Sequence, residues 1–274
     1  MRWVIGDIHG MLKPLAQLIY AVRAQDSQAR FLFVGDYVNR GPDSRGVVDL
    51  LLRLPAGTAR FARGNHDDIF DLILNGKSFA SGADPVPVFA WFMAHGLDRT
   101  LHSYGIDDAM IEHVARKPSQ ARLVDLVESI PQDHRTFFRH LPLVIEEHDL
   151  FVIHARWSPE DSDIRPDLAA PIAQHAKLKH RVLWERFSDE ELNRKKQWQR
   201  RGFFGHTPVV NYAVTDDQDN VPIIAKQAVL VDTGLALFEQ GRLTAFCVES
   251  DDYIQTTRFG EIIVNGKTDE ASNR

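Results

Sequence analysis

The chain has 274 residues, of which 44% are apolar, and this is enough for one large domain with its own hydrophobic core. Its 32 Lys and Arg against 38 Asp and Glu give a net charge of −6, which argues against broad binding to nucleic acids or membrane surfaces. Cys247 is the single cysteine, so an internal disulfide is impossible and a reducing, cytoplasmic setting is expected. The chain starts in a predicted strand without a leader pattern, and no apolar run approaches the ~20 residues that span a bilayer.

The N-terminal part alternates short apolar runs with segments of helical periodicity. The apolar runs predict strands at residues 2–5, 31–34 and 60–63. The spacing of apolar residues predicts helices at 12–24 and 45–53, and a further helix that begins at 68–75. Strands and helices in this order predict parallel strands joined by crossover helices, and so an α/β fold.

A helical insertion of about residues 68–142 is predicted to follow the third strand. Within it, residues 76–88 are rich in Gly, Ser and Pro and predict a loop, and 89–104 and 119–129 predict helices. Two interpretations of the insertion remain open: it is a packing unit, or it forms a wall of a substrate cleft. The two interpretations are compatible. After it, 143–146 and 150–153 predict a hairpin.

The C-terminal half is more polar than the first half. Residues 158–200 are expected to be helical or irregular, and late strands, mostly antiparallel, are predicted at 228–233, 242–248 and 258–264. We expect a single domain over residues 1–264. Residues 265–274 are polar and are expected to form a frayed tail.

Polar side chains follow five short apolar runs, at the point where each run ends. Four of these runs are predicted strands, at 2–5, 31–34, 60–63 and 150–153, and the fifth is Gly202-Phe-Phe-Gly205. In Phe31-Leu-Phe-Val-Gly-Asp36, for example, a glycine ends the apolar run and a carboxylate follows. Ligands of open α/β sheets bind beyond the carboxyl ends of the strands, so these side chains are expected to converge in a cleft. The converging residues are Asp7, His9, Asp36, Asn65, His66, His154 and His206, with Arg40 beside them.

This set offers oxygen and nitrogen ligands without sulfur, which suits two divalent transition metal ions such as Mn, Fe or Zn. Asp36 can bridge the two ions, and Asn65 can give a carbonyl oxygen to the second. Such a pair, roughly 3.5–4 Å apart, activates a shared hydroxide and neutralises phosphoryl oxygens. Arg40 is expected to grip the remaining phosphoryl oxygens, with Arg186 as a second candidate. His66 is the expected proton donor.

The motifs around these residues resemble those of the phosphoprotein phosphatase family within the calcineurin-like metallophosphoesterases. Three of them follow one another near the N-terminus and together are highly specific. Further motifs resemble bacterial members of the family, among them Val182-Leu-Trp184-Glu-Arg186 and His95-Gly-Leu-Asp-Arg-Thr100-Leu-His-Ser-Tyr104-Gly. The N-terminal three are Gly6-Asp7-Ile8-His9-Gly10, Gly35-Asp36-Tyr37-Val38-Asn39-Arg40-Gly41 and Gly64-Asn65-His66-Asp67, and Val152-Ile153-His154-Ala155 and Gly205-His206-Thr207-Pro208 follow later.

The resemblance implies a central β-sandwich of two mixed sheets flanked by helices, with a dinuclear metal site. It implies a hydroxide that bridges the metals and attacks a phosphomonoester, with His66 as general acid and Arg40 as phosphate clamp. The substrate would be a phosphorylated protein or a small phosphorylated or nucleotide compound, and manganese the favoured metal. The implied ligands are Asp7, His9 and Asp36 for one ion, and Asp36, Asn65, His154 and His206 for the other.

One departure from the family bears directly on the chemistry. Protein phosphatases of the family have a second aspartate at the position of Asn39, where it supports the charge of the catalytic histidine. An asparagine brings no charge, so protonation of His66 should be less favoured. Symmetrical dinucleoside tetraphosphatases also lack that aspartate, and they commonly carry the Gly-Asn-His-Asp motif that Asp67 completes here.

Three functions therefore remain open. A serine/threonine protein phosphatase-like enzyme is the main expectation, and a symmetrical diadenosine tetraphosphate hydrolase is the alternative. A non-catalytic phosphate-binding scaffold is the third, and the complete ligand set argues against it.

Overall fold

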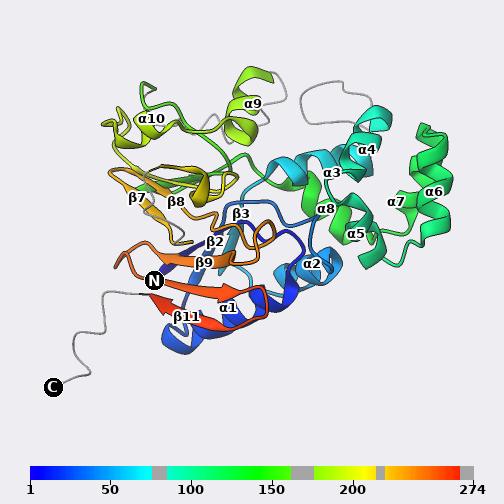
Figure 1. The fold of residues 1–274 in the computed structure, drawn as a ribbon. Coiled ribbons are helices and arrows are strands. Elements are labelled where there is room, and N and C mark those ends of the chain that lie inside the picture. The colour runs from blue at the N-terminus through cyan, green and yellow to red at the C-terminus, as the bar shows by residue number, and fades with distance from the viewer. Residues whose placement is uncertain (76–84, 162–175, 214–219, 266–274) are drawn as a thin grey trace.

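The computed structural model describes residues 1–75, 85–161, 176–213 and 220–265. Two mixed β-sheets form the centre, and helices flank them (Figure 1). This arrangement confirms the predicted class of a two-sheet sandwich with helices on the outside.

The first sheet has six strands in the order β11-β10-β9-β1-β2-β3. Strands β1, β2 and β3 are parallel, as the alternation of strands and helices predicted. The three C-terminal strands are antiparallel and join the sheet beside β1. Their bounds are β1 Arg2–Ile5, β2 Arg30–Phe33, β3 Ala59–Phe61, β9 Arg242–Cys247, β10 Tyr253–Thr257 and β11 Ile262–Asn265.

The second sheet has five strands in the order β4-β5-β6-β8-β7. The predicted hairpin is present as the antiparallel pair β4–β5, and β6 runs parallel to both β5 and β8. The bounds are β4 Val144–Glu146, β5 Leu150–Ile153, β6 Arg201–Phe204, β7 Ile223–Ala225 and β8 Ala228–Leu230.

Helices α3 to α8 form a lobe beside the two sheets, and α9 and α10 lie over the second sheet (Figure 1). Among the described residues no helix is both long and apolar enough to span a membrane. The helices are α1 Leu12–Gln25, α2 Ser44–Leu52, α3 Asn65–Asn75, α4 Pro85–Met93, α5 Leu97–Ser103, α6 Asp108–Arg116, α7 Gln120–Glu128, α8 Gln132–His140, α9 Ala176–Trp184 and α10 Asp189–Asn193, with a 3₁₀ turn at Val209–Asn211.

The central strands are apolar throughout because both of their faces are buried. In β1, Trp3 and Ile5 pack under the helices of the first sheet, whereas Val4 between them faces the other sheet. In β5, Phe151 and Val152 divide in the same way between the helix side and the interior of the sandwich. Successive side chains on a strand point to opposite faces, so continuous apolar runs are what a two-sided core requires.

The helical insertion differs from the prediction in three places. Of the predicted loop at 76–88, residues 76–84 lie outside the described residues. The remaining residues, 85–88, form the start of helix α4. The predicted helix at 89–104 is broken into α4 and α5, because Gly96 adopts a left-handed conformation (φ 87°) before α5. Helices α6 and α8 were not predicted.

The C-terminal region also departs from the prediction at its strands. Strands β7 and β10 were not predicted, and the run predicted at 258–264 is a strand only from Ile262, which extends to Asn265. The remainder of the expected polar tail, 266–274, and residues 162–175 of the expected helical or irregular region lie outside the described residues.

Candidate active site

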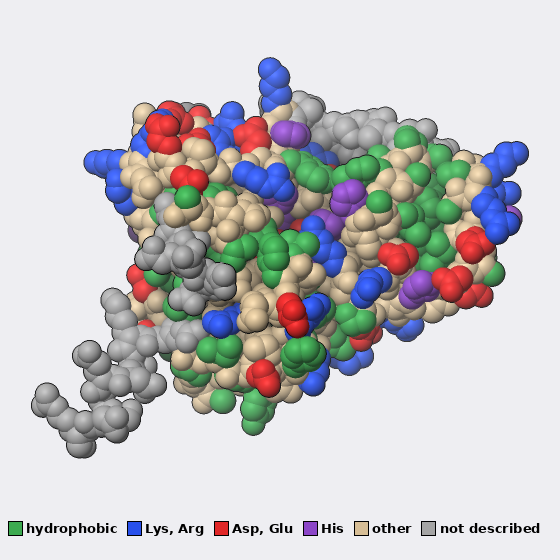
Figure 2. Space-filling view, in the orientation of Figure 1, with side chains coloured by type: hydrophobic (Ala, Val, Ile, Leu, Met, Phe, Trp, Pro, Cys, Tyr) green, Lys and Arg blue, Asp and Glu red, His purple; other side chains and the backbone are tan. Residues whose placement is uncertain are grey.

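The polar residues that end five strands come together at one place, as predicted. The first sheet supplies residues that follow β1, β2 and β3, and the second sheet supplies residues that follow β5 and β6. All are buried or nearly so. Figure 2 shows histidine side chains (purple) and basic side chains (blue) gathered in the hollow between the sheets and the helical lobe. The assembled residues are Asp7, His9, Asp36, Asn65, His66, His154 and His206.

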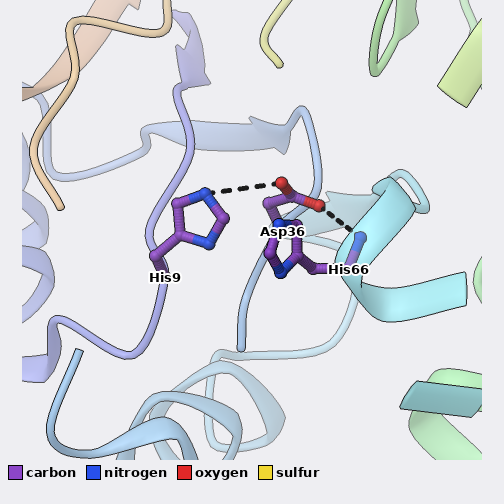
Figure 3. A group of neighbouring side chains, drawn as sticks. All are labelled: His9, Asp36 and His66. Atoms are coloured by element: carbon purple, nitrogen blue, oxygen red, sulfur yellow. Dashed lines mark hydrogen bonds and ion pairs between the residues drawn. The ribbon is translucent and has the colours of Figure 1, made fainter. Parts of the chain in front are cut away.

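Asp36 lies at the centre of this cluster. Its Oδ2 is 3.4 Å from Nε2 of His9, and its Oδ1 is 3.4 Å from Nε2 of His154. Oδ1 also accepts a hydrogen bond of 3.0 Å from the backbone N–H of His66 (Figure 3). The two oxygens therefore face two different histidines, which is the geometry that a carboxylate needs to bridge two ions.

Backbone carbonyls orient the three histidines that were predicted to bind metal. Nδ1 of His9 donates to the Val38 carbonyl and Nδ1 of His154 to the Val34 carbonyl, each over 3.0 Å. His206 uses its other nitrogen, Nε2, toward the Trp184 carbonyl over 3.1 Å. The nitrogen left for a ligand is turned toward the cluster in each ring, and an orienting partner of this kind is typical of histidines that bind metals.

The donor atoms fit a divalent cation. Oδ1 of Asn65 lies 2.8 Å from Nε2 of His154 and 3.1 Å from Nδ1 of His206, so three possible ligand atoms converge. Donor atoms of Asp7, Asp36 and His154 lie within 4.8 Å of one another, as do those of His9, Asp36 and His66. Carboxylate, imidazole and amide donors without thiolate suit Mn, Fe or Zn, and how the ligands divide between two ions stays a prediction.

Burial and neighbouring charges shift the pKa values of several groups in the cluster. Burial raises the pKa of Asp7 well above its usual value, and the charge of Asp232 adds to this effect. Burial and the charge of His154 lower the pKa of His206 to about 3. Burial disfavours a charged His154, but the neighbouring Asp36 carboxylate outweighs it and raises the pKa of His154 to about 9. The Asp36 carboxylate thus favours positive charge at the centre of the cluster.

Arg40 reaches into the cluster from the loop after β2. Its Nη1 lies 2.8 Å from Nε2 of His9, and its Nη2 lies 3.2 Å from Nε2 of His66. The guanidinium cation thus lies beside His9, a predicted metal ligand. A phosphoryl group that bound next to His9 would be within its reach.

Two other arginines, Arg186 and Arg156, differ in their exposure and in their ion pairs. Arg186 is exposed, and its charge contributes to the lowered pKa of His206, so it lies near the cluster. Arg156, two residues after His154, is tied to Glu191 and Glu185, the latter over 2.7 Å. Its charge is neutralised by these partners, and we assign it a structural role.

His66, the predicted acid, is held on two sides. Nδ2 of Asn39 lies 3.0 Å from its Nδ1, and the ring of Phe92 from helix α4 packs against it at 5.2 Å between ring centroids. Burial lowers the pKa of His66 to about 4. Burial therefore disfavours a charged ring, and the expected effect of Asn39 on His66 stays a prediction.

Backbone strain concentrates at this site. Seven described residues other than glycine have positive φ, and five of them belong to the site: His9, Asp36, Asn39, Arg40 and His206. Such conformations cost about 1–3 kcal/mol each and persist only where the surrounding structure holds them, which is common at functional sites. The sequence gives no sign of this strain, because any of these residue types can occupy ordinary regions.

Sequence reasoning gave Asp67 no role beyond its place in a motif. The structure shows that its carboxylate accepts hydrogen bonds from the backbone N–H groups of Asp36, Tyr37 and Gly64, at 2.7, 2.9 and 2.9 Å. It therefore fixes the loop that carries Asp36. Gly205 is equally specific, because a Cβ there would lie 2.1 Å from Oδ1 of Asp7.

Comparison with known proteins identifies the family. A family model described as calcineurin-like phosphoesterase matches residues 2–210. The chain therefore belongs to the calcineurin-like phosphoesterase family.

Relatives within the family carry two different names. Serine/threonine-protein phosphatase 1 of Salmonella typhimurium is 28% identical over 211 residues, which is 76% of this chain and 78% of that protein. A symmetrical bis(5'-nucleosyl)-tetraphosphatase of Legionella pneumophila is 34% identical over 83 residues, and the match spans only 30% of either protein.

A solved structure assigned as a diadenosine tetraphosphatase has the same fold. It aligns with a TM-score of 0.52 at 22% identity and covers 93% of this chain and 92% of that one. This likeness supports the fold alone.

Proposed function

We propose that the protein is a dinuclear-metal phosphohydrolase, and that its substrate is a phosphomonoester of the kind cleaved by serine/threonine protein phosphatases. The position of Asp36 between two sets of donors carries this proposal. The long match to the Salmonella phosphatase supports the substrate class. Bound divalent ions would activate a water nucleophile and neutralise charge on the phosphoryl oxygens.

The chain's own residues would do the rest. Asp7, His9, Asp36, Asn65, His154 and His206 would hold the ions, with manganese as our proposed metal. Arg40, with Arg186 at the rim, would bind the remaining phosphoryl oxygens. His66 would present its Nε2 to the leaving oxygen, and Phe92 would keep water from its ring. We further propose that residues 1–264 act as one domain and that the protein works in the cytoplasm, where its buried Cys247 stays reduced.

The test is a side-by-side rate assay on metal-stripped protein reconstituted with Mn²⁺. The substrates are a phosphoserine/phosphothreonine peptide, diadenosine tetraphosphate and an aryl phosphate. Metal-dependent turnover with preference for the peptide supports the proposal. If all three stay unhydrolysed while metal is bound, the enzyme proposal is wrong and the phosphate-binding scaffold takes its place.

Asn39 favours a second candidate, a symmetrical dinucleoside tetraphosphate hydrolase. Asn39 brings no negative charge to His66, and the leaving group of a tetraphosphate needs less protonation than a serine alkoxide does. Preference for diadenosine tetraphosphate, with nucleoside diphosphate as product, would support this candidate over the first.

Replacing Asn39 with Asp should raise activity on phosphoserine peptides more than on aryl phosphates. An aspartate would accept a hydrogen bond from Nδ1–H of His66 and support a charged ring, which helps a poor leaving group most. General acids contribute about 10²–10⁴-fold, so we expect a gain of roughly tenfold on the peptide and little change on the aryl phosphate.

The matched control is Asn193→Asp, which adds the same charge at an exposed position of helix α10. Equal changes on both substrates in the Asn39 variant would remove the link between Asn39 and the leaving group.

A further inference from the structure

A pair of buried hydroxyl groups lies behind Asn39. Thr100 of helix α5 and Ser44, the first residue of helix α2, are both fully buried, and their hydroxyl oxygens are 2.9 Å apart. Both accept from the backbone N–H of Asn39, over 2.9 Å for Thr100 and 3.2 Å for Ser44. One of the pair thus comes from the helical insertion and the other from the core of the fold.

The Thr100 hydroxyl also determines how the Asn39 side chain is turned. Its Oγ1 is 2.9 Å from Oδ1 of Asn39, to which it donates. The amide oxygen therefore faces Thr100, and the amide nitrogen faces Nδ1 of His66 at 3.0 Å. An amide nitrogen is only a donor, so Nδ1 must accept, and the proton of a neutral His66 ring lies on Nε2.

Arg40 makes the competing contact. Its Nη2 lies 3.2 Å from Nε2 of His66, and a hydrogen bond there would require an unprotonated Nε2. The two contacts demand opposite tautomers. The Asn39 contact is the more constrained of the two, because Asn39 and His66 are both buried and Asn39 is hydrogen-bonded at its backbone and its side chain, whereas Arg40 is partly exposed.

We infer that Thr100 is a positioning residue that acts through Asn39 to keep the proton of His66 on Nε2, the nitrogen that faces the substrate. This inference rests on the proposed function. His66 then serves as a neutral hydrogen-bond donor to the leaving oxygen.

The insertion holds Thr100 firmly enough for this role. Gly96, at the start of helix α5, packs directly on the backbone of Arg40, and a Cβ at Gly96 would lie 2.6 Å from the Arg40 nitrogen. The insertion is thereby fixed against the loop that carries Asn39, and it contributes to the chemistry as well as to the wall of the cleft.

The direct test is the ¹⁵N NMR spectrum of histidine-labelled, zinc-loaded protein, with the His66 signals assigned by their loss in His66→Asn. We expect the Nε2–H tautomer in the wild type and in Thr100→Ser, which keeps the hydroxyl. In Thr100→Val, of similar shape, we expect a mixture of tautomers. An Nδ1–H tautomer in the wild type, or an unchanged spectrum in Thr100→Val, would overturn the inference.

The kinetic test compares two leaving groups on manganese-loaded protein. Thr100→Val should lower kcat by about tenfold on a phosphoserine peptide and by less than about twofold on an aryl phosphate, with KM unchanged, and Thr100→Ser should behave as wild type. Equal losses on both substrates with reduced metal content would make Thr100 merely structural. Absence of turnover in the wild type would instead refute the proposed function, and the NMR result would still decide the tautomer.

Discussion

Replacing Asp36 with Asn is expected to lower metal-dependent turnover by at least about 10³-fold, because it removes the charge that the two predicted ions share. Each oxygen of Asp36 faces a different histidine at 3.4 Å. The substitution keeps the shape of the side chain, and its amide oxygen can still accept from the N–H of His66. The loss should therefore arise at the metal site and leave the fold intact.

Metal content and thermal stability separate this explanation from simple misfolding. Saturating Mn²⁺ should raise the melting temperature of the wild type, since binding at 100 times Kd contributes about 2.7 kcal/mol, and should raise that of Asp36→Asn much less. The control is Asp125→Asn, an exposed residue of helix α7, which should match the wild type in rate and metal content. Wild-type turnover in the Asp36 variant would refute the proposed mechanism.

Replacing Arg63 with Met should cost about 3–5 kcal/mol of folding stability, the largest stability effect that we expect, because it takes the buried guanidinium partner from the fully buried Asp71 carboxylate, whose other described partners are Arg139 at 3.7 Å and Asn75. Arg63 is fully buried after β3, and its Nη1 pairs with Asp71 at 3.0 Å and Asp68 at 3.3 Å. Its other nitrogens donate to carbonyls at the end of helix α8, including Phe138 at 2.7 Å and Leu141 at 3.0 Å. One side chain thus joins β3, α3 and α8.

Denaturant titration and thermal unfolding measure this cost, and we expect the melting temperature to fall by about 10 °C. The control is Arg116→Met, whose side chain is 79% exposed and pairs with Glu112 one turn away, so its cost should stay below about 0.5 kcal/mol. Similar losses in both variants would mean that the buried network adds little beyond an exposed pair. The variant Asp71→Asn removes the negative charge that pairs with Arg63 and so tests the same buried network.

The ends of the central strands were predictable because their signal is local. A buried strand leaves a continuous apolar run, and the residue that follows it is visible in the sequence, as with Asp36 after β2. The convergence of His154 and His206 with the N-terminal residues followed from the same rule, since the carboxyl ends of both sheets point to one place.

The missed elements lack that local signal. Strand β10 contains Gln255, which is polar but fully buried. The amide nitrogen of Gln255 tolerates burial because it donates to the Asn220 carbonyl and to the Thr244 hydroxyl, over 2.6 and 2.8 Å. Helix α8 is strongly polar and is held by tertiary contacts such as that between His134 and Tyr104. Helix α4 begins with Pro85 and Pro87, which suggest a loop, although proline is tolerated in the first turn of a helix.

Parts of the site depended on the same long-range contacts. Thr100 reaches Asn39 across 61 positions of sequence, and only the folded chain brings the two together. The motif that contains Thr100 is visible in the sequence, but nothing in the motif indicates that Thr100 forms a hydrogen bond with Asn39. Asp67 is next to a predicted acid, and its bonds to three backbone N–H groups likewise follow from the shape of the loop rather than from its composition.

The measurement that tests the central claim most directly is a titration of metal-stripped protein with Mn²⁺, in which bound metal per chain and turnover of an aryl phosphate are followed together. The proposed dinuclear site predicts two ions per chain and a rate that rises until the second ion binds. Full turnover in rigorously metal-free protein, or two bound ions without any turnover, would contradict it.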